Sequence, residues 1–397
     1  MPKVLRIINR FNLGGPTYNA AYLTKYLEPD FETLLVGGYK DETEEKSDFI
    51  VKSIGIEPVI IPEMRRSINI KNDLIAYKKL SGIIKDFKPD IVHTHASKAG
   101  FLGRYAAHKN NVPVIIHTFH GHVFHSYFKN YKSFIYKNIE RYLARVSTKI
   151  IAISELQKEE LAYKYKIAPP DKITVIPLGF DLNKFRENQD LKRRTFRDQY
   201  AIADDEIAIG IVGRLVPIKN HKLFIDSIVS VKKKSSKKIR AFIVGDGECR
   251  RELESYAVSQ GLEISGNENL NSKSTLKFTS WIKNVDVVYS GLDIVTLTSL
   301  NEGTPVSLIE AQASSRPIVT TNAGGIENTV SHNLTALVSK NGNPQEFTNN
   351  LLRLVDDREL RESLSRMGWD FVANKFHFSR LADDMRSLYF ELLAKKK

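Results

Sequence analysis

The sequence predicts two tandem α/β domains, each built on a parallel sheet of the doubly wound kind. Short apolar runs alternate with longer helix-like segments along almost the whole chain. This alternation is typical of parallel strands joined by crossover helices. The length of 397 residues allows two domains of ordinary size, each with a core of its own.

The strand-like runs form two series separated by a proline and glycine interruption at residues 176–181. The runs lie at 4–8, 33–36, 58–61, 91–93, 112–117, 150–153 and 173–176 in the first series, and at 207–212, 240–244, 276–278, 294–297, 317–321 and 336–338 in the second. We therefore expect an N-terminal domain over residues 1–178 and a C-terminal domain over residues 179–375. The amphipathic segment 376–397 predicts a closing helix that packs back on the N-terminal domain.

Composition indicates a globular protein, with 42% hydrophobic and 26% charged residues. The single cysteine, Cys249, excludes an intrachain disulfide and favours a reducing compartment. The first residues lead directly into a strand-like run, unlike a signal peptide, and no run approaches the ~18 apolar residues of a membrane span. These features predict a soluble, cytoplasmic protein.

The net charge of +13 is concentrated in the first half of the chain. Residues 1–180 hold 27 basic and 18 acidic residues, a net +9, which leaves +4 for the rest. Nucleic acid, an anionic membrane surface or an acidic substrate would each suit this excess, and so would a solvated basic surface without a partner. The basic run 232–238 contains no aromatic residue, which counts against nucleic acid.

One segment of the first half has helical periodicity and a basic face. Its apolar residues recur at steps of three or four, and they are Phe128, Tyr131, Ile135, Ile139, Tyr142 and Val146. Lys137, Arg141 and Arg145 repeat at steps of four on another face. This pattern predicts either a surface helix that contacts anionic lipid or a helix whose apolar stripe is core.

The most informative stretch is residues 299–311, which follow a strand-like run. Thr304 and Pro305 form a cap-then-proline pattern that predicts a helix start. The backbone N–H groups of Val306 and Ser307 would then be unpaired at the positive end of the helix dipole, where a phosphate can bind. Glu302 precedes this start and Glu310 follows it, so the two carboxylates would reach different parts of one ligand.

Other loops of the second series fit a ligand that carries phosphate. Gly213 ends a strand and is followed by Arg214 and Lys219, a fork-shaped and a point cation that suit a diphosphate. Gly245 and Gly303 let the backbone approach a ligand closely. Ligands of open α/β sheets bind beyond the carboxyl ends of the strands, so we expect the site at that edge.

In the first series, a glycine turn and two groups of histidines follow the strands. Gly14 and Gly15 precede a helix start, and His95 and His120 lie in histidine groups after two successive strands. No Asp, Glu or Cys accompanies the histidines to complete a zinc site, so we expect no metal. Their position favours hydrogen bonds to a ligand.

Taken in order, these motifs resemble the retaining glycosyltransferases of family 4, which have the GT-B fold of two Rossmann-like domains facing across a cleft. The resemblance covers almost the whole chain and rests on the Gly14-Gly15 loop, the passage 118–121, the linker 176–181, the Gly213 to Lys219 segment, the turn 245–247 and the Glu302 to Glu310 pair. The passage 93–100 further resembles members that build bacterial polysaccharides.

The resemblance implies sugar transfer with retention from a nucleotide sugar, with UDP as the first choice, to a glycan or lipid-linked glycan. Arg214 and Lys219 would hold the diphosphate, assisted by Gly303, Thr304, Val306 and Ser307, and Glu310 would bind the ribose.

Glu302 would lie near the anomeric carbon, and His120 would contact the sugar or the acceptor. Gly14 and Gly15 would approach the diphosphate from the opposite domain. His95 and the basic face of residues 137–145 would face the acceptor or the membrane, and neither metal nor other cofactor would be required. The alternatives are a nucleotide-sugar epimerase of the same fold and, from another class, a basic nucleic-acid-binding protein.

Overall fold

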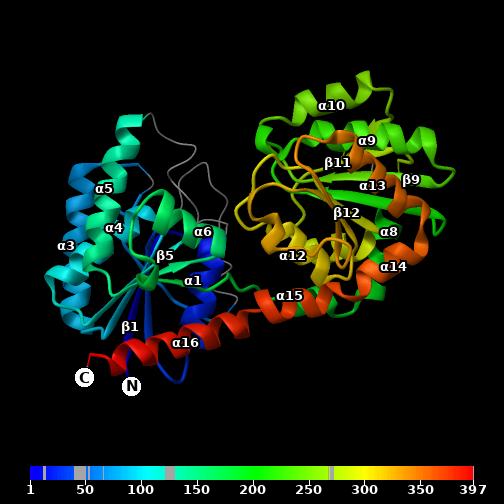
Figure 1. The fold of residues 1–397 in the computed structure, drawn as a ribbon. Helices are drawn as coiled ribbons and strands as arrows, with labels where there is room; N and C mark the ends of the chain where they lie inside the picture. Colours follow the sequence, from blue (N-terminus) through cyan, green and yellow to red (C-terminus); the bar gives the residue numbers. More distant parts are fainter. Residues whose placement is uncertain are drawn as a thin grey trace. The chain divides into compact units, whose positions relative to one another are not determined.

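A computed structural model describes residues 1–11, 15–39, 51, 54–65, 67–120, 130–266, 268 and 272–396, without the side chains of 130–133. The chain divides into two compact units, one formed by Met1–Phe180 with Phe376–Lys397 and the other by Asp181–Lys375 (Figure 1). Each unit contains, within the described residues, a parallel sheet of seven strands with helices around it. The predicted α/β fold class is confirmed, and the boundary expected after Leu178 lies two residues before the one in the structure.

The first sheet has the strand order β3-β2-β1-β4-β5-β6-β7. Its strands are β1 Lys3–Arg10, β2 Glu32–Gly38, β3 Val59–Ile60, β4 Ile91–His95, β5 Val114–Phe119, β6 Lys149–Ala152 and β7 Ile173–Val175. All seven expected runs of this unit form strands. The fifth begins and ends two residues later than expected, so that it includes Thr118 and Phe119.

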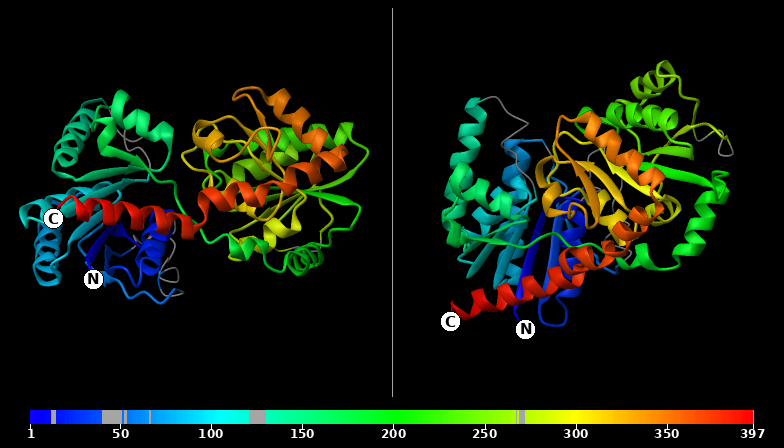
Figure 2. Two further views of the ribbon diagram at one scale, coloured as in Figure 1. Left: turned by 60° about the horizontal axis from the view of Figure 1, so that its bottom comes forward. Right: turned by 45° about the vertical axis from the view of Figure 1, so that its right-hand side comes forward.

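Helices cover both faces of the first sheet. They are α1 Gly15–Tyr26, α3 Ile70–Phe87, α4 Ser97–Lys109, α5 Asn130–Val146, α6 Glu155–Glu159 and α16 Phe378–Ala394. On one face α3 and α4 pack through Leu80, Ile84 and Leu102 on strand residues such as Val92. On the other face α16 packs beside α1, as both views of Figure 2 show, and buries Leu388 against the sheet.

The second sheet has the strand order β10-β11-β9-β8-β12-β13-β14. Its strands are β8 Glu206–Val212, β9 Lys238–Val244, β10 Ile264–Ser265, β11 Leu276–Thr279, β12 Ile294–Leu297, β13 Ile318–Thr321 and β14 Ala336–Ser339. The six expected runs form strands. The short edge strand β10 was not expected, because two residues are too few to produce an apolar pattern.

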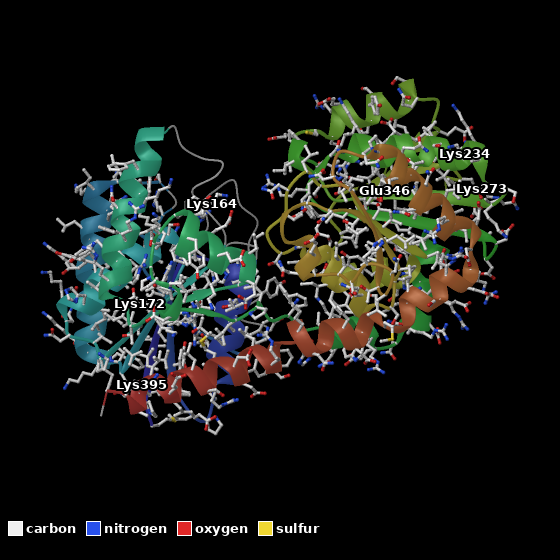
Figure 3. The ribbon with its side chains drawn as sticks, in the orientation of Figure 1. Lys164, Lys172, Lys234, Lys273, Glu346 and Lys395 are labelled. Carbon is white, nitrogen blue, oxygen red and sulfur yellow. The ribbon has the colours of Figure 1, made fainter. Side chains whose placement is uncertain are left out.

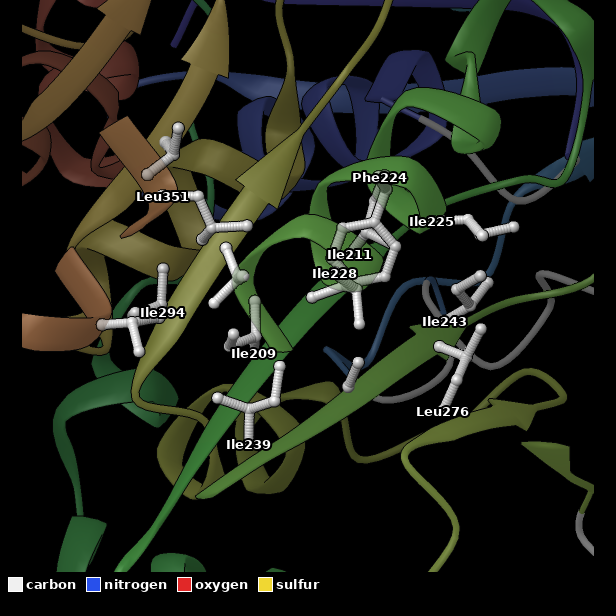
Figure 4. Packing of buried hydrophobic residues seen from close by; sticks show 14 of the residues in the cluster. Ile209, Ile211, Phe224, Ile225, Ile228, Ile239, Ile243, Leu276, Ile294 and Leu351 are labelled. Carbon is white, nitrogen blue, oxygen red and sulfur yellow. The ribbon is translucent and has the colours of Figure 1, made fainter. Parts of the chain in front are cut away.

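The helices of the second unit are α7 Asn183–Arg186, α8 Gln189–Gln199, α9 His221–Lys234, α10 Arg250–Ser259, α11 Val285–Gly291, α12 Val306–Ala313, α13 Pro344–Asp356, α14 Arg358–Arg366 and α15 Gly368–Phe376. Branched residues of β8 and β9, such as Ile211 and Ile243, meet Phe224 and Ile228 of α9 in the core (Figure 4). Side chains such as Lys234 and Lys273 extend outward into solvent (Figure 3).

No helix among the described residues is long and apolar enough to cross a membrane.

Candidate active site

Four loops meet at the carboxyl edge of the second sheet. They follow β9, β8, β12 and β13, which are consecutive neighbours in the parallel sheet. Carboxyl ends of parallel strands share one edge, so the residues after Val244, Val212, Leu297 and Thr321 come together there. The expected grouping of the second-unit motifs therefore follows from the strand order.

A lysine and a glutamate pair at this edge. Lys219 Nζ lies 2.5 Å from Glu302 Oε1, and the Ser299 hydroxyl donates to the same oxygen at 2.6 Å. Both charged side chains remain partly exposed, Lys219 at 22% and Glu302 at 11%. The pair is thus fixed in position and still open to a ligand.

Hydrogen bonds to backbone carbonyls hold together the two loops that carry Lys219 and Glu302. The Thr298 hydroxyl donates to the Lys219 carbonyl at 2.9 Å, and the Leu300 N–H donates to the Ile218 carbonyl at 2.8 Å. The Thr321 hydroxyl donates to the Ser299 carbonyl at 2.8 Å. The loop that carries Lys219 is therefore held against the loop that carries Glu302, although 83 residues separate the two side chains in sequence.

The glycine pair after β13, Gly324 and Gly325, packs directly against the backbone of the Glu302 loop. A Cβ on Gly325 would lie 1.7 Å from the Gly303 carbonyl oxygen, and one on Gly324 would lie 2.2 Å from the Glu302 carbonyl oxygen. The Gly325 N–H donates to that Glu302 carbonyl at 2.9 Å. Gly324 also has φ +62°, which favours glycine. A larger residue at either position would displace the loop.

The helix after Glu302 begins one residue later than expected. Helix α12 starts at Val306, Pro305 occupies the cap position, and no side chain caps the helix. The expectation that Thr304 caps and Pro305 opens the helix is therefore wrong, because the chain is still non-helical at Pro305, whose ψ is 94°. The N–H groups of Val306 and Ser307 remain in the first turn, where they have no partner within the helix.

Glu310 lies in α12 as a partly buried carboxyl. Burial raises the pKa of Glu310 to about 7, while Lys184 opposes the shift. The fully buried Tyr289 interacts with Glu310. Burial is the main cause, and the nearby Glu310 the second, that raises the pKa of the Tyr289 phenol well above its usual range. Glu310 is consequently a carboxyl that changes charge near neutral pH.

The remaining cation predicted for the site, Arg214, has an exposed side chain. Within the described residues, no hydrogen bond or ion pair engages its guanidinium. Gly213 lies beside the Lys219 stem, since an added Cβ would be 3.9 Å from Lys219 Cε. Gly245 has φ +140°, and its Cβ would lie 2.0 Å from the Gly213 carbonyl oxygen, so Gly245 is needed for packing of the two loops.

The carboxyl edge of the first sheet carries buried histidines. His95 ends β4 and His120 follows β5, the neighbouring strand, and His95 Nδ1 lies 2.9 Å from His120 Nε2. His95 has 0% exposure, so the expectation that it faces an acceptor directly is wrong. His120 is partly exposed.

A second buried cluster lies behind these two rings. Arg6 Nη1 is 3.0 Å from His93 Nδ1 and donates to the Tyr389 hydroxyl at 3.2 Å. His93 Nε2 is 2.7 Å from Thr118 Oγ1. Tyr389 belongs to α16, so the closing helix reaches the middle of the first sheet.

Burial keeps the histidines of this edge neutral. It lowers the pKa of His120 to about 3 and, assisted by nearby cations, lowers the pKa values of His93, His95 and His117 well below the ordinary 6.5. Gly15 begins α1 at the same edge, after β1, whereas Gly14 lies outside the described residues.

The basic helix α5 differs from one of the two expectations for it, that its apolar stripe is core. Its buried face is Glu140, Leu143 and Ala144, and Glu140 pairs with the buried Arg104 at 2.6 Å. Two residues of the predicted apolar stripe, Ile135 and Tyr142, are instead 52% and 44% exposed. The idea that this stripe is core is therefore wrong for these residues, while Phe128 and the Tyr131 side chain lie outside the described part.

Two of the three residues of the predicted basic face have structural contacts. Arg141 donates to the carbonyls of Lys166 and Tyr165, at 3.0 and 2.8 Å, and Lys137 Nζ lies 5.2 Å from the Tyr165 ring centroid. Arg145 is exposed. The basic face is thus partly used to hold the helix on the unit.

No group of three or more His, Cys, Asp or Glu side chains suited to a metal ion occurs in the described part of the chain. Independence from metals remains a prediction.

The sequence also matches known proteins. The signature described as "Glycosyltransferase Family 4" matches residues 14–184, and that described as "Glycosyl transferases group 1" matches residues 192–369. The chain is a GT4-like glycosyltransferase with the GT-B fold.

Two bacterial relatives cover most of the chain. The Escherichia coli UDP-Gal:alpha-D-GlcNAc-diphosphoundecaprenol alpha-1,3-galactosyltransferase is 29% identical over 86% of this chain and 85% of its own length. The Staphylococcus aureus capsular polysaccharide biosynthesis glycosyltransferase CapM is 27% identical over 83% of this chain and 84% of its own.

Two solved structures share the fold. Anabaena HepE in complex with UDP and glucose has a TM-score of 0.78 at 17% identity, over 98% of this chain and 100% of that one. The Neisseria meningitidis UDP-GlcNAc 2-epimerase bound to UDP-GlcNAc has a TM-score of 0.64 at 15% identity, over 99% and 100%.

Several residues of the site were not predicted from the sequence. Ser299, Thr298 and Thr321 hold the Lys219–Glu302 pair, and Tyr289 and Lys184 set the environment of Glu310. The three hydroxyl residues follow or end strands of the site edge, which is a weak signal that sequence could have offered. Nothing in the sequence near Tyr289 or Lys184 points to Glu310.

Proposed function

We propose that this chain transfers a sugar, with retention of anomeric configuration and without a metal ion, from a UDP-sugar to a hydroxyl of a lipid-linked glycan during the synthesis of a bacterial surface polysaccharide. The acceptor and the donor base are suggested by the Escherichia coli relative, whose name states a UDP-sugar and a diphosphoundecaprenol acceptor. The GT4-like assignment supports the transfer itself.

The proposal that this edge binds the donor rests on the fixed Lys219–Glu302 pair, which precedes the start of α12. A lysine held next to unpaired helix N–H groups stabilises the negative charge that a diphosphate gains as it leaves. Arg214, exposed on the neighbouring loop, supplies a planar fork for the same oxygens. Together these groups perform the work that a divalent cation does in other sites.

Retention follows if the acceptor attacks from the side that the diphosphate leaves. The bond between the anomeric carbon and the phosphate oxygen breaks, and the bond to the acceptor oxygen forms on the same face. The hydroxyl proton then passes to the departing phosphate oxygen, so no protein base is needed. Glu302, paired with Lys219, fits a role in stabilising the sugar rather than in attacking it.

The experiment combines a panel of nucleotide sugars with an undecaprenyl-diphosphate-linked sugar and follows nucleotide release. We expect release from a UDP-sugar that depends on the acceptor and persists in EDTA, and a product whose anomeric configuration by NMR equals that of the donor. An inverted product would overturn retention, and loss of turnover in EDTA that added metal restores would overturn independence from metals.

An epimerase of the same fold would need no acceptor. Incubation with the donor alone therefore separates the two functions, since an epimerase would change the configuration of the sugar while it stays on the nucleotide. We expect the donor to be recovered unchanged. A nucleic-acid-binding protein would instead bind DNA or RNA with an affinity that falls steeply with salt, and show no turnover.

Action on a lipid-linked acceptor requires contact with the membrane, and α5 offers a surface for it. Its outward face exposes Phe134 (65%), Ile135 and Tyr142 together with Arg145, and its single acidic residue, Glu140, is buried in an ion pair. Exposed aromatics beside cations suit the interface of an anionic bilayer.

Co-sedimentation with vesicles tests this contact. The double variant Phe134→Ser/Arg145→Glu should bind vesicles containing anionic lipid several-fold less than the wild type, since it loses both apolar and charge contacts. The control Lys85→Glu reverses an exposed charge on α3, another helix of the first unit. Equal binding by all three proteins would remove α5 from the proposal.

A further inference from the structure

The loop that carries Arg214 is held by the glycine turn after β9. The Leu215 N–H donates to the Asp246 carbonyl at 3.0 Å, and the Cys249 N–H donates to the Leu215 carbonyl at 3.0 Å. On the other side of Arg214, the Gly213 N–H donates to the carbonyl of the last residue of β9 at 2.9 Å. The backbone on both sides of Arg214 is therefore fixed to this turn.

The side chain of Asp246 closes the turn. Its Oδ1 accepts from the Gly247 N–H at 2.8 Å, and its Oδ2 accepts from the Ser280 hydroxyl at 3.4 Å. Oδ2 also forms an ion pair with Arg250 Nη1 at 3.3 Å. A Cβ on Gly247 would lie 2.4 Å from the Leu215 carbonyl oxygen, so the turn is in direct contact with the neighbouring loop. A change in the turn is therefore transmitted to that loop.

Arg250, the first residue of α10, connects this turn to the neighbouring strand β11. Its Nη1 and Nη2 atoms donate to the carbonyls of Thr279 and Phe278 at the carboxyl end of β11, at 3.4 Å each. Its Nε donates to Glu254 Oε1 at 2.8 Å, on the next turn of the helix. All three nitrogen atoms of this guanidinium thus have partners inside the unit, whereas the exposed Arg214 guanidinium has none among the described residues.

We propose that Arg250 is a positioning residue for the donor diphosphate, which acts through Asp246 on the cation Arg214. Arg250 holds Asp246 and the end of β11 in place, and the turn that Asp246 closes fixes the backbone of Arg214. A fixed backbone reduces the conformational freedom that the exposed Arg214 side chain loses when it binds a diphosphate. The effect of Arg250 on turnover rests on the proposed sugar transfer, whereas its hold on the Arg214 loop does not.

Hydrogen exchange of the full-length protein without any ligand tests the hold on the loop. In Arg250→Ala, peptides covering residues 213–219 should exchange at least about threefold faster than in the wild type, with β12 unchanged, because the turn that accepts the Leu215 N–H is loosened. Arg251→Ala is the matched control, since Arg251 is the next residue of α10, is exposed, and forms no hydrogen bond or ion pair within the described part of the chain. Unchanged exchange over 213–219 in Arg250→Ala would overturn the inference.

A double-mutant cycle in nucleotide release separates positioning from a merely structural role. Arg250→Ala should lower kcat/KM about tenfold in the wild-type background, because a small displacement of a binding group lowers the rate. In the Arg214→Ala background the same substitution should change kcat/KM less than about twofold, because the residue through which Arg250 acts is absent. Equal losses in the two backgrounds would contradict the positioning role.

Thermal unfolding of each variant serves as the control for folding. If Arg250→Ala does not fold, Arg250→Lys takes its place in both experiments, since lysine keeps a charge beside Asp246 but lacks the planar fork that reaches β11. A wild type that turns over no nucleotide sugar would refute the proposed function, and hydrogen exchange would still decide whether Arg250 holds the Arg214 loop. The two failures are thus distinguishable.

Discussion

The carboxyl edges of the two sheets are built from the same topology but from different chemistry. The edge of the second sheet gathers Lys219, Glu302 and Arg214 in partly exposed positions around the start of α12. The edge of the first sheet gathers neutral, buried imidazoles around His95 and His120. Charged groups near water suit a diphosphate, while neutral donors and acceptors suit hydroxyl groups.

Burial, more than residue type, sets the protonation state of the titratable groups at each edge. Burial holds the histidines in the uncharged form and raises the pKa of Glu310 to about 7. The two shifts have opposite effects on how the free energy of unfolding changes with pH. Burial favours the deprotonated, neutral form of a histidine but the protonated, neutral form of a glutamate. The two units should therefore respond differently to pH and to substitution.

The largest expected effect is a selective loss of stability of the first unit in acid. The folded pKa values of His93, His95, His117 and His120 lie below the unfolded value of 6.5, so the unfolded chain takes up protons as pH falls below 6.5. From pH 7.5 to pH 5, His120 alone should lower the free energy of unfolding by about 2 kcal/mol, and His93, His95 and His117 act in the same direction. In the second unit, burial lowers the pKa of His221 to about 4, so His221 also lowers stability in acid. Glu310, whose pKa is raised, has the opposite effect there.

Hydrogen exchange followed by mass spectrometry at the two pH values measures this difference. After correction for the intrinsic exchange rate, protection in β4 and β5 should fall much more than protection in β8 and β12. Equal losses in the two sheets would show that the histidine cluster does not set the acid response.

The next largest effect concerns the cations of the second edge. Lys219→Ala and Arg214→Ala should each lower kcat by about 10²–10³-fold, because a preorganised group that stabilises transition-state charge contributes about 3–4 kcal/mol. Lys222→Ala is the matched control, since Lys222 lies on the same loop-helix segment but pairs with the exposed Glu252. Nucleotide release measures turnover, and unchanged rates for both variants would remove the two cations from the site.

A smaller effect is expected at Glu310. Its raised folded pKa means that its stabilising contribution is present below pH 4.5 and is lost as pH rises through about 7. Glu310→Gln should therefore raise the free energy of unfolding at pH 8 by about 2 kcal/mol and change it little at pH 5. The same variant should weaken UDP binding most above pH 7, where the wild-type carboxylate is ionised.

Denaturant unfolding and calorimetric titration with UDP measure the two effects of Glu310→Gln. The exposed Glu359, on α14, provides the control Glu359→Gln, for which neither quantity should change with pH. A Glu310→Gln protein that is destabilised at pH 8, or that binds UDP as the wild type does, would contradict the assignment.

The smallest effect distinguishes two neighbouring glycines. Gly303→Ala should change stability by less than about 0.5 kcal/mol, since no atom lies within 4 Å of the added Cβ, and should raise the donor KM several-fold if the diphosphate contacts this loop. Gly325→Ala should instead destabilise the second unit, because its Cβ would meet the Gly303 carbonyl oxygen at 1.7 Å. Thermal unfolding and donor KM separate the two, and an unchanged KM for Gly303→Ala would place the donor elsewhere.

Much of the fold was readable from apolar periodicity. Every expected strand is present, because buried parallel strands produce short apolar runs that differ clearly from their surroundings. The α5 helix was also expected, yet its buried face was not, since Glu140 and Arg104 pair inside the unit and leave Ile135 outside. Apolar periodicity predicts that a helix has an apolar and a polar face. Which face is buried, and against which element, depends on tertiary packing.

The two sheets and the residue types at their carboxyl edges could be predicted from the sequence, since strand ends and loop residues are local properties of the chain. The assembled fold was needed to show that Ser299 and Thr298 fix the Lys219–Glu302 pair, that Tyr289 interacts with Glu310, and that His95 contacts His120. These contacts join residues that are distant in sequence or face inward. Their pKa values and proton positions depend on the burial that the assembled fold imposes.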